Sequence, residues 1–412
     1  MVKIIIFQGV GGFLESPNSA MKTSGGGLSG LLPLLPYWKK WGHDIEFVTN
    51  RLDSGIMEYK KMFVTHVVPS FGTKFDSSRL QAFLVTFFSF AVQLGNVRKI
   101  IARSMELEKN AILLNVDGGV SNVIISAYLK RKFNIMPIVN FHHIPPGPFR
   151  NGQRRGNFVR NLLTYLNTSV SLVIGKISGL TISLGNPDEL EIRGWKYEHV
   201  FANLYPMDVG ESYSTTEDSK EYDASFLGRI SPNKGIIDLI RIWKGVVTVR
   251  PMAKIILMGA QTDNSFLKRV KRLIKKFNLM ENIIITGPVS EIVKLENLKK
   301  SRVFLFPSYE EGWGISVTEA IVNGSLPVVY DLPAYNYLGK SLPKVPVGDM
   351  ENMVKYVMKF IDDNVLRRKT IAELRDTLRS YTSENVAKAN MDSILYAYNF
   401  ECNSKVEESS NE

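Results

Sequence analysis

Short apolar runs alternate with longer helix-like segments along almost the whole chain, and this alternation constrains the fold more than any other feature. The runs are short and mostly apolar, which is typical of strands covered on both faces. Strands separated by helical segments predict an α/β fold with a parallel, doubly wound sheet, in which ligands bind beyond the carboxyl ends of the strands. In the first half of the chain the predicted strands are residues 3–8, 42–50, 65–68, 111–116, 135–141, 180–184 and 199–204.

A chain of 412 residues is too long for one ordinary domain. Residues 208–223 are polar and lack periodicity, which predicts a linker between two domains. We therefore expect an N-terminal domain over residues 1–207 and a C-terminal domain over residues 224–383. A last helical segment, residues 384–400, and a disordered tail, residues 401–412, complete the predicted organisation.

Charge and cysteine content limit the classes of partner and site. The net charge is +11 and the isoelectric point is about 9.4, which favours an anionic partner, although solvated surface charge accounts for part of the excess. The single cysteine, Cys402, excludes a disulfide framework and a cysteine-rich metal site. This composition is typical of a reducing compartment and predicts a cytoplasmic protein.

The sequence predicts neither a signal peptide nor a membrane span. The N-terminal run MVKIIIFQG is short and leads into glycine without a cleavage site. The longest apolar stretch, Leu80 to Leu94, is shorter than the roughly 20 residues that cross a bilayer. A mostly buried helix is the expected structure there. An apolar face that touches the inner surface of the cell membrane is the alternative.

Residues 303–331, VFLFPSYEEGWGISVTEAIVNGSLPVVYD, show strand, loop, helix, turn and strand patterns in close succession. Glu311 lies in the loop before the helix, and Glu319 lies about two turns along it. Both carboxylates can face a cleft at the strand ends, towards which the free backbone N–H groups of residues 312–314 also point. Two solvated surface glutamates are the alternative interpretation.

A second candidate motif is GRISPNKG, which follows the first predicted strand of the second domain. Arg229 and Lys234 flank a Ser-Pro-Asn turn, and a helix opens directly after them. The guanidinium fork, the ammonium charge and the helix dipole would together bind a diphosphate. An ordinary surface loop is the alternative.

Glycines follow the first predicted strand of the chain. The cluster SGGGLSG, residues 24–30, precedes a helical stretch, as in the βαβ unit of nucleotide-binding proteins. As a dinucleotide fingerprint the cluster is weak, because it begins about 15 residues beyond the strand. Glycines at Gly25 to Gly27 let a ligand approach backbone N–H groups at a helix start. A plain tight turn is the alternative.

The segment NFHHIPPG places two adjacent histidines at a predicted strand end. Side chains alternate along a strand, so at most one of His142 and His143 faces a cleft squarely. No cysteine or Glu-x-x-His partner lies nearby, so metal binding is disfavoured. A structural histidine pair is the alternative to a functional one.

The helical segment around KRVKRLIKKF carries apolar residues on one face and Lys or Arg on the others. We expect a surface helix, because this is the pattern of a helix that packs one face on a core. Contact with a membrane or a nucleic acid is the alternative.

The segments EEGWGISVTEA and PVVYDLPA resemble the E-x7-E motif of the retaining family-4 glycosyltransferases, also called glycosyl transferases group 1. GRISPNKG resembles the GR-x-x-x-x-KG segment of the same family. The resemblance covers nearly the whole chain and implies the GT-B fold. In that fold two Rossmann-like domains enclose an interdomain cleft, and a C-terminal helix, here residues 384–400, crosses back onto the first domain. Trp313 stands where the family usually has Phe, and His-His stands where it has a His-Asp or His-Glu pair.

The resemblance also implies roles for individual residues. Arg229 and Lys234 would hold the donor diphosphate, Glu311 would hold the sugar hydroxyls, and Glu319 would accept hydrogen bonds from the ribose. His142 would lie near the reacting sugar. Further donor contacts would come from the glycine-rich segments, at Gly312, Trp313, Gly314, Ile315, Gly25 and Gly26.

These roles predict a glycosyltransferase that moves a hexose-type sugar from a nucleotide-diphosphate sugar to a glycan or lipid-linked acceptor. Retention of configuration is implied by the resemblance alone. No cofactor or metal is expected, because Arg229, Lys234 and a helix N-terminus can stabilise the leaving diphosphate and no Asp-x-Asp occurs. Another GT-B reaction, such as sugar-nucleotide epimerisation, is the alternative. Nucleic acid is not expected as a partner, whereas peripheral contact with an anionic membrane is.

Overall fold

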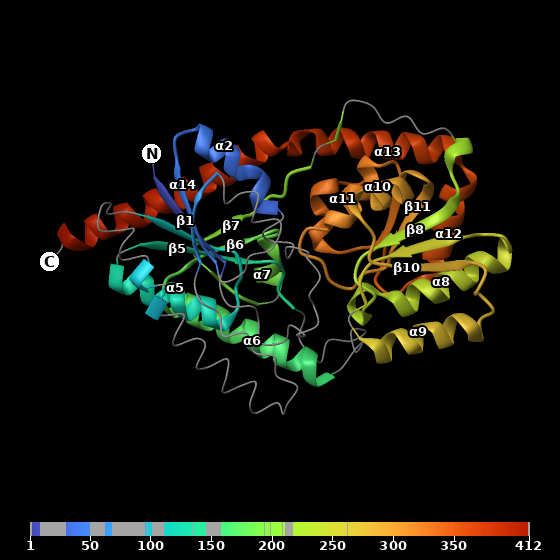
Figure 1. The fold of residues 1–412 in the computed structure, drawn as a ribbon, viewed down its shortest axis with the longest axis horizontal. Helices are drawn as coiled ribbons and strands as arrows, with labels where there is room; N and C mark the ends of the chain where they lie inside the picture. Colours follow the sequence, from blue (N-terminus) through green and yellow to red (C-terminus); the bar gives the residue numbers. More distant parts are fainter. Residues whose placement is uncertain are drawn as a thin grey trace. The chain divides into compact units, whose positions relative to one another are not determined.

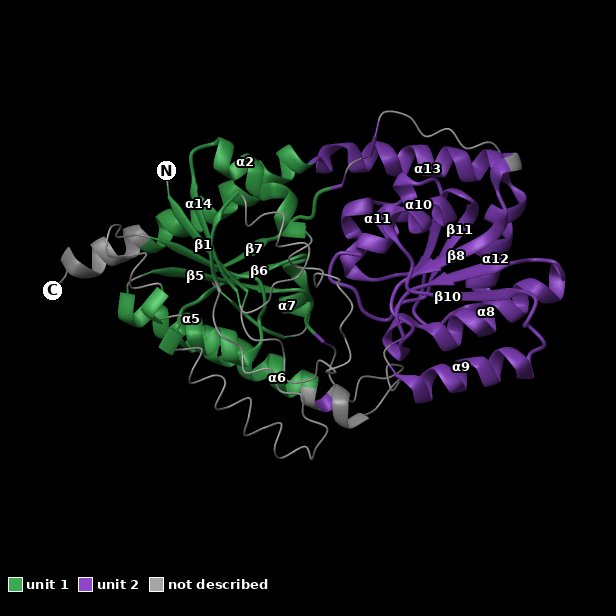
Figure 2. Cartoon of the chain, in the orientation of Figure 1, with its two compact units in different colours: residues 1–144, 163–206, 383–412 green, residues 145–162, 207–382 purple. Residues whose placement is uncertain are grey.

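The chain divides into two compact units, each with its own parallel sheet. Unit 1 comprises residues 1–144, 163–206 and 383–412, and unit 2 comprises residues 145–162 and 207–382 (Figure 2). The computed structural model describes residues 2–8, 30–49, 62–67, 95–96, 98–100, 111–133, 135–145, 158–192, 194–197, 199–207, 209–210, 217–261 and 263–410.

In the described part of unit 1, seven strands form one parallel sheet with the order β3-β2-β1-β4-β5-β6-β7 (Figure 1). The strands at the centre of the sheet, β1, β4 and β5, are mainly apolar and are buried along almost their whole length. Their bounds are β1 Lys3–Gln8, β2 Asp44–Thr49, β3 Val64–Val67, β4 Ile112–Asn115, β5 Met136–Phe141, β6 Thr181–Leu184 and β7 Val200–Ala202.

The last helix of the chain, α14 (Ser383–Ser410), packs on unit 1. The indole of Trp38 donates a hydrogen bond to the Ala387 carbonyl at 2.8 Å. The Asn390 side-chain amide accepts a hydrogen bond from the Leu204 backbone N–H and donates one to the Leu204 carbonyl.

The helix α14 continues to Ser410, so residues 401–410 of the segment that we predicted as a disordered tail are helical. Its glutamates and lysine are good helix formers, which low hydrophobicity alone does not reveal.

The other helical elements of unit 1 lie between its strands. They are η1 (Leu32–Leu34), α2 (Leu35–Lys40), α5 (Val120–Phe133), α6 (Phe158–Ile177), of which residues 158–162 belong to unit 2, and α7 (Asp188–Ile192). The apolar stretch from Leu80 to Leu94 and residues 146–157, which precede α6, lie outside the described residues.

In unit 2, six strands form a parallel sheet with the order β10-β9-β8-β11-β12-β13. The strand bounds are β8 Tyr222–Leu227, β9 Ile255–Met258, β10 Ile283–Gly287, β11 Ser301–Phe306, β12 Leu326–Tyr330 and β13 Lys344–Val345. The two doubly wound parallel sheets confirm the predicted fold class.

Helices cover both faces of the second sheet. One face carries α8 (Ile236–Val249), α9 (Asn264–Lys276) and α12 (Met350–Asp362) (Figure 1). The other carries α10 (Glu291–Lys299), α11 (Ile315–Val322) and α13 (Asn364–Leu378), and shorter turns are η2 (Glu217–Ser219), η3 (Pro232–Lys234), η4 (Pro333–Leu338) and η5 (Arg379–Tyr381).

The strand order reverses its direction at β8, because the chain first adds β9 and β10 on one side and then returns to place β11 on the other. The loops that follow β8 and β11 therefore leave towards opposite faces of the sheet. In open α/β sheets this reversal opens a crevice at the carboxyl ends of the two strands, where ligands bind.

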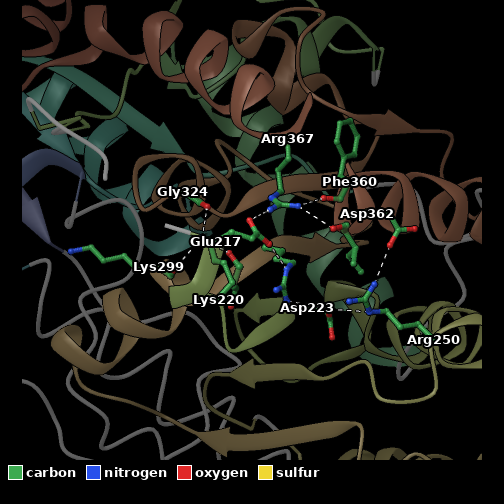
Figure 3. A network of polar contacts seen from close by, with 12 residues as sticks. Glu217, Lys220, Asp223, Arg250, Lys299, Gly324, Phe360, Asp362 and Arg367 are labelled. Carbon is green, nitrogen blue, oxygen red and sulfur yellow. Dashed lines mark hydrogen bonds and ion pairs between the residues drawn. The ribbon is translucent and has the colours of Figure 1, made fainter. Parts of the chain in front are cut away.

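A polar network anchors the segment that enters unit 2 (Figure 3). Glu217 accepts hydrogen bonds from Arg302, at 2.7 Å, and from Arg367, whose side chain is 2% exposed. Lys220 donates to three backbone carbonyls at 2.7–2.9 Å, which belong to Lys299, Ser301 and Gly324. The residues just before β8 are therefore fixed to unit 2, although we predicted a linker up to residue 223.

Removing the Glu217 carboxylate should destabilise unit 2. Glu217→Ala would leave the buried Arg367 guanidinium without its carboxylate, and we expect a cost of about 1–3 kcal/mol because Glu217 itself is 29% exposed. The control Asp376→Ala breaks a pair with Arg379 in which both side chains are about 70% exposed, and should cost no more than about 1 kcal/mol. Calorimetric unfolding of the full chain measures both, and equal shifts would contradict the prediction.

The loss of stability caused by Glu217→Ala should depend on pH. Burial raises the pKa of Glu217, but hydrogen bonds and charge from Arg302 and Arg367 outweigh it, and the pKa is lowered from its usual 4.5. Its contribution to stability is therefore complete above about pH 4.5 and disappears as the pH falls through the lowered value. The difference in melting temperature between the wild type and Glu217→Ala should shrink over that acid range.

Candidate functional site

Two loops of unit 2 meet at the reversal of the strand order, one after β8 and one after β11. Gly235 lies between η3 and α8 with a φ of 68°, a left-handed conformation that favours glycine. A Cβ atom at residue 235 would lie 1.8 Å from the carbonyl oxygen of Pro307 in the other loop. Only glycine allows this approach, so Gly235 sets the distance between the two loops.

Hydrogen bonds join the same two loops. The backbone carbonyl of Asn233 accepts from the backbone N–H of Tyr309 at 3.0 Å. The Asn233 side-chain amide donates to Glu310 at 2.7 Å, and its oxygen accepts from the Ser231 hydroxyl at 2.6 Å. The loop of GRISPNKG and the loop of PSYEEGWG therefore form one connected structure.

This arrangement brings together two of the residues singled out in the sequence, Lys234 and Glu311. The ammonium of Lys234 lies 2.5 Å from a carboxylate oxygen of Glu311, and the two side chains are 15% and 11% exposed. Arg229, at the start of the same loop, is exposed. One cation is therefore neutralised by a largely buried carboxylate, and a second is open to solvent at the end of β8.

Glu319 does not share the lysine that pairs with Glu311. On α11 it accepts a hydrogen bond from Lys294 of α10 at 2.5 Å, and Lys294 also pairs with the exposed Glu291 at 2.6 Å. Burial raises the pKa of Glu319, and the charge of Lys294 opposes that rise. The two glutamates of the motif are thus held by two different lysines.

Among the described residues, no side chain caps the N-terminus of α11. Gly314, the residue before it, has a φ of 85°, and a Cβ there would lie 2.5 Å from the ring of Tyr335. The glycine therefore keeps the loop pressed against that ring. The backbone N–H groups of the first turn, including that of Ile315, are those that the sequence predicted for donor contacts.

The side chain of Trp313 packs into an aromatic cluster. Its ring stacks on Tyr337 with a centroid distance of 4.1 Å and an interplanar angle of 13°, and its edge meets Tyr381 at 5.6 Å. The Tyr337 hydroxyl donates to the Trp313 carbonyl at 3.2 Å. The indole fills this cluster, in which the related family usually has the smaller Phe. Its packing fixes the backbone between Gly312 and Gly314.

A buried carboxylate lies beneath the loops. Asp238, in the first turn of α8, is fully buried and accepts hydrogen bonds from the hydroxyls of Tyr309 and Tyr330, the second at 2.9 Å. Tyr309 belongs to the loop after β11, and Tyr330 ends β12. Asp238 thereby connects α8, β12 and the candidate site through charge-assisted hydrogen bonds.

Another tyrosine of this region has no such acceptor. Tyr335, in η4, is fully buried, and its hydroxyl has no hydrogen-bond partner among the described residues. Burial, followed by the charge of Glu311, raises its pKa well above 10. A buried hydroxyl without a partner costs free energy, so its position beside Glu311 and Gly314 calls for a functional reason.

In unit 1, His142 follows β5. Its Nδ1 atom is buried and has no hydrogen-bond partner among the described residues. Burial lowers the pKa of His142, Asp117 opposes this effect, and His143 adds to it. A lowered pKa keeps the imidazole neutral near pH 7. Gly25 and Gly26, the other predicted residues of unit 1, lie outside the described residues.

Two kinds of site are absent from the described residues. No group of three or more His, Cys, Asp or Glu side chains is placed to hold a metal ion there. None of the helices in the described ranges combines the length and the apolar content that a bilayer span requires.

Sequence reasoning missed several residues that build the site. Asn233, Asp238, Lys294 and Tyr309 hold the predicted residues in place, yet each acts through a partner far away in the chain. Asn233 and Tyr309 lie inside the two motifs, so the motifs could have identified them as site residues. No sequence pattern indicates that Lys294 contacts Glu319.

Comparisons with known proteins agree with this architecture. Residues 211–377 match the family described as Glycosyl transferases group 1. An uncharacterized glycosyltransferase of Methanocaldococcus jannaschii is 32% identical over 138 residues, which are 32% of each chain. A poly(glycerol-phosphate) alpha-glucosyltransferase of Bacillus subtilis is 30% identical over 128 residues, which are 30% of this chain and 17% of that one. The matched segments thus span a third or less of these relatives.

Solved structures match over a greater length. The S. aureus protein TarM, in a complex with fondaparinux, alpha-GlcNAc-glycerol and UDP, superposes with a TM-score of 0.70 at 11% identity. The match covers 97% of this chain and 100% of the other. The chain therefore has the GT-B fold, and residues 211–377 match the glycosyl transferases group 1 family.

Two buried tyrosines of unit 2 provide a matched test of the hydrogen bonds beneath the site. Tyr330→Phe removes a donor to the buried Asp238 carboxylate and should destabilise unit 2 by about 1–3 kcal/mol. Tyr335→Phe removes a hydroxyl that has no partner among the described residues and should leave stability unchanged or slightly higher. Both positions are fully buried, so thermal unfolding compares them directly. Equal losses would contradict the assignment.

Proposed function

We propose that the chain is a glycosyltransferase that moves a hexose-type sugar from a nucleotide-diphosphate sugar to a glycan or lipid-linked acceptor. The single observation that carries this proposal is the Lys234–Glu311 pair at the reversal of the strand order, beside the N-terminus of α11. The relatives and the matching domain family support the same reaction class.

The Lys234–Glu311 pair indicates how a donor would bind. A diphosphate competes with Glu311 for the Lys234 ammonium, because it carries more charge and more acceptor oxygens than a carboxylate. Once displaced, Glu311 can accept hydrogen bonds from the sugar hydroxyls. Breaking this one ion pair would therefore free Lys234 to bind the phosphate and Glu311 to bind the sugar.

Departure of the diphosphate places negative charge at the carboxyl ends of β8 and β11. The exposed guanidinium of Arg229, the ammonium of Lys234 and the backbone N–H groups from Gly312 to Ile315 would stabilise that charge. These groups supply the positive charge that a divalent ion supplies elsewhere, so we propose a metal-independent reaction without a cofactor. We also propose retention of configuration, with the leaving phosphate accepting the proton of the acceptor hydroxyl.

The other predicted residues complete the proposal. Glu319, held by Lys294, would accept from the ribose hydroxyls. His142, kept neutral by burial, would contact the reacting sugar, and Gly25 and Gly26 would let the donor approach the backbone. The Tyr335 hydroxyl would gain a partner when donor is present, because it is buried next to Glu311.

The printed names of the relatives suggest which substrates to try first. TarM was solved with UDP and alpha-GlcNAc-glycerol, and the Bacillus subtilis relative is a poly(glycerol-phosphate) alpha-glucosyltransferase. A uridine donor and an anionic or lipid-linked acceptor are therefore proposed here. A cytoplasmic enzyme at the inner face of the cell membrane would meet both substrates.

A donor screen with EDTA present tests the proposal. We expect one of the UDP-, GDP- and ADP-sugars to raise the melting temperature and to be turned over with an acceptor glycan. Lys234→Gln should weaken nucleotide binding about 10- to 100-fold, since a charge-assisted hydrogen bond contributes about 1.5–3 kcal/mol. The double variant Lys234→Gln with Glu311→Gln avoids a stranded carboxylate and should show the same loss.

The control is Lys355→Gln, which breaks an exposed pair with Glu351 on α12 and should bind donor normally. If no nucleotide sugar binds without metal, or if all variants bind alike, the site assignment fails. Conversion of a sugar nucleotide without transfer to any acceptor would point instead to an epimerase.

Lys294 allows a second, independent test, because it pairs with two glutamates. Glu319→Gln and Glu291→Gln each remove one carboxylate from Lys294, but only Glu319 belongs to the proposed donor site. We expect Glu319→Gln to weaken nucleoside-diphosphate binding about tenfold and Glu291→Gln to leave it unchanged. Isothermal titration of both variants decides the matter, and equal affinities would remove Glu319 from the donor site.

A further inference from the structure

The helix α9 has one face in the core of unit 2 and a strongly basic outer surface. Phe266, Val270 and Ile274 are buried against the sheet, which fixes the orientation of the helix. The Asp263 side chain caps its N-terminus by accepting from two backbone N–H groups. Because α9 is anchored in this way, its outer side chains form a defined surface.

Six exposed cations lie on that surface, and the helix carries no acidic residue between Asn264 and Lys276. None of the six makes an ion pair with a described residue. Some exposed lysines elsewhere in unit 2 do have such partners: Lys300 pairs with Glu221, and Lys355 pairs with Glu351. The six are Lys268, Arg269, Lys271, Arg272, Lys275 and Lys276.

Beyond the C-terminal end of α9 there is an exposed apolar cluster. Met280, four residues after the helix, is 65% exposed, and Met252 and Val249 are 80% and 68% exposed. The Asn282 side-chain amide donates to the Pro251 and Ala253 carbonyls at 2.8 and 2.9 Å, so the two turns that carry the methionines lie side by side. We call Val249, Met252 and Met280 the apolar tip.

We propose that the outer surface of α9 and the apolar tip together form the surface by which the chain docks on an anionic phospholipid membrane. Cations near an anionic leaflet each strengthen binding several-fold, and they act together when one rigid element presents them. Methionine is flexible and apolar, so the tip can enter the boundary between headgroups and acyl chains.

The combination of charge with exposed apolar side chains selects this partner. A nucleic acid would satisfy the cations of α9 but would offer no apolar phase to Met252 and Met280. Cations that serve only solubility need no neighbouring apolar side chains that are 65% or more exposed. A bilayer with anionic headgroups satisfies both features at once.

The inference stands apart from the proposed donor site. The apolar tip precedes β9 and β10 and so lies at the amino ends of the strands, whereas Lys234 and Glu311 follow β8 and β11 at their carboxyl ends. Docking through α9 would leave the donor residues unblocked. Membrane docking is consistent with a lipid-linked acceptor, but the docking proposal does not require one.

Vesicle flotation of the full chain tests the proposal. We compare vesicles of phosphatidylcholine alone with vesicles that contain about 30% phosphatidylglycerol, at low and high salt. The variant K268Q/K271Q/R272Q/K275Q neutralises one row of α9, and the control K340Q/R368Q/K369Q/K388Q neutralises four exposed cations elsewhere. Each variant lowers the net charge by four, from +11 to +7. We expect the wild type and the control to bind the anionic vesicles, and the α9 variant to bind at least tenfold more weakly.

Fluorescence tests the contribution of the apolar tip separately from that of α9. Met280→Trp places a fluorophore at the tip, and its emission should shift to the blue when anionic vesicles are added, as it should not with phosphatidylcholine alone. Met252→Gln with Met280→Gln should weaken vesicle binding and should not alter donor turnover in solution.

Three results would overturn the proposal: equal loss of binding in the α9 variant and the control, no spectral shift at residue 280, or tighter binding of the wild type to a soluble polyanion such as heparin than to vesicles. A membrane-bound protein that turns over no nucleotide sugar would contradict the proposed function alone. A soluble enzyme with normal turnover would contradict the docking surface alone.

Discussion

The contact between Gly235 and the Pro307 carbonyl is the constraint on which the candidate site depends. Any side chain at residue 235 would collide with that carbonyl, and the left-handed φ at this position is strained for residues other than glycine. This approach lets Asn233 bond the neighbouring loop and brings Lys234 within 2.5 Å of Glu311. The contact between Lys234 and Glu311 therefore requires glycine at residue 235, because a Cβ atom there would hold the two loops apart.

Charge is balanced inside the site before any ligand arrives. Glu311 and Glu319 are largely buried, and burial disfavours an ionised carboxylate unless a cation compensates it. Each has its own lysine, and in the proposed donor complex a dianionic ligand would bind by exchanging partners with one of these pairs. The exposed Arg229 would attract the incoming anion, and Lys294 would keep Glu319 oriented.

The sequence predicted the strands for a physical reason, and its motifs singled out candidate site residues. Central strands of a parallel sheet are buried on both faces, so they appear as continuous apolar runs, and β1 begins and ends at the predicted residues, 3–8. Residues near strand ends, such as Lys234 and Glu311, follow from the motifs. Their partners do not, because Lys294 meets Glu319 only through the packing of α10 beside α11. Asp238 and its two tyrosines were missed for the same reason. The helical end of α14 was missed because polar composition was taken for disorder.

A parallel sheet separates its two ends, and unit 2 illustrates the consequence. Carboxyl ends of strands meet glycine turns, helix N-termini and their positive dipoles, which suit an anionic ligand. Amino ends meet helix C-termini, whose negative dipoles favour nearby cations such as Lys275 and Lys276 at the end of α9. The same dipoles therefore favour the cations in the last turn of α9 at one end of the sheet and would favour a bound anion at the other. A chain with this topology can bind a charged surface and a charged substrate without competition between them.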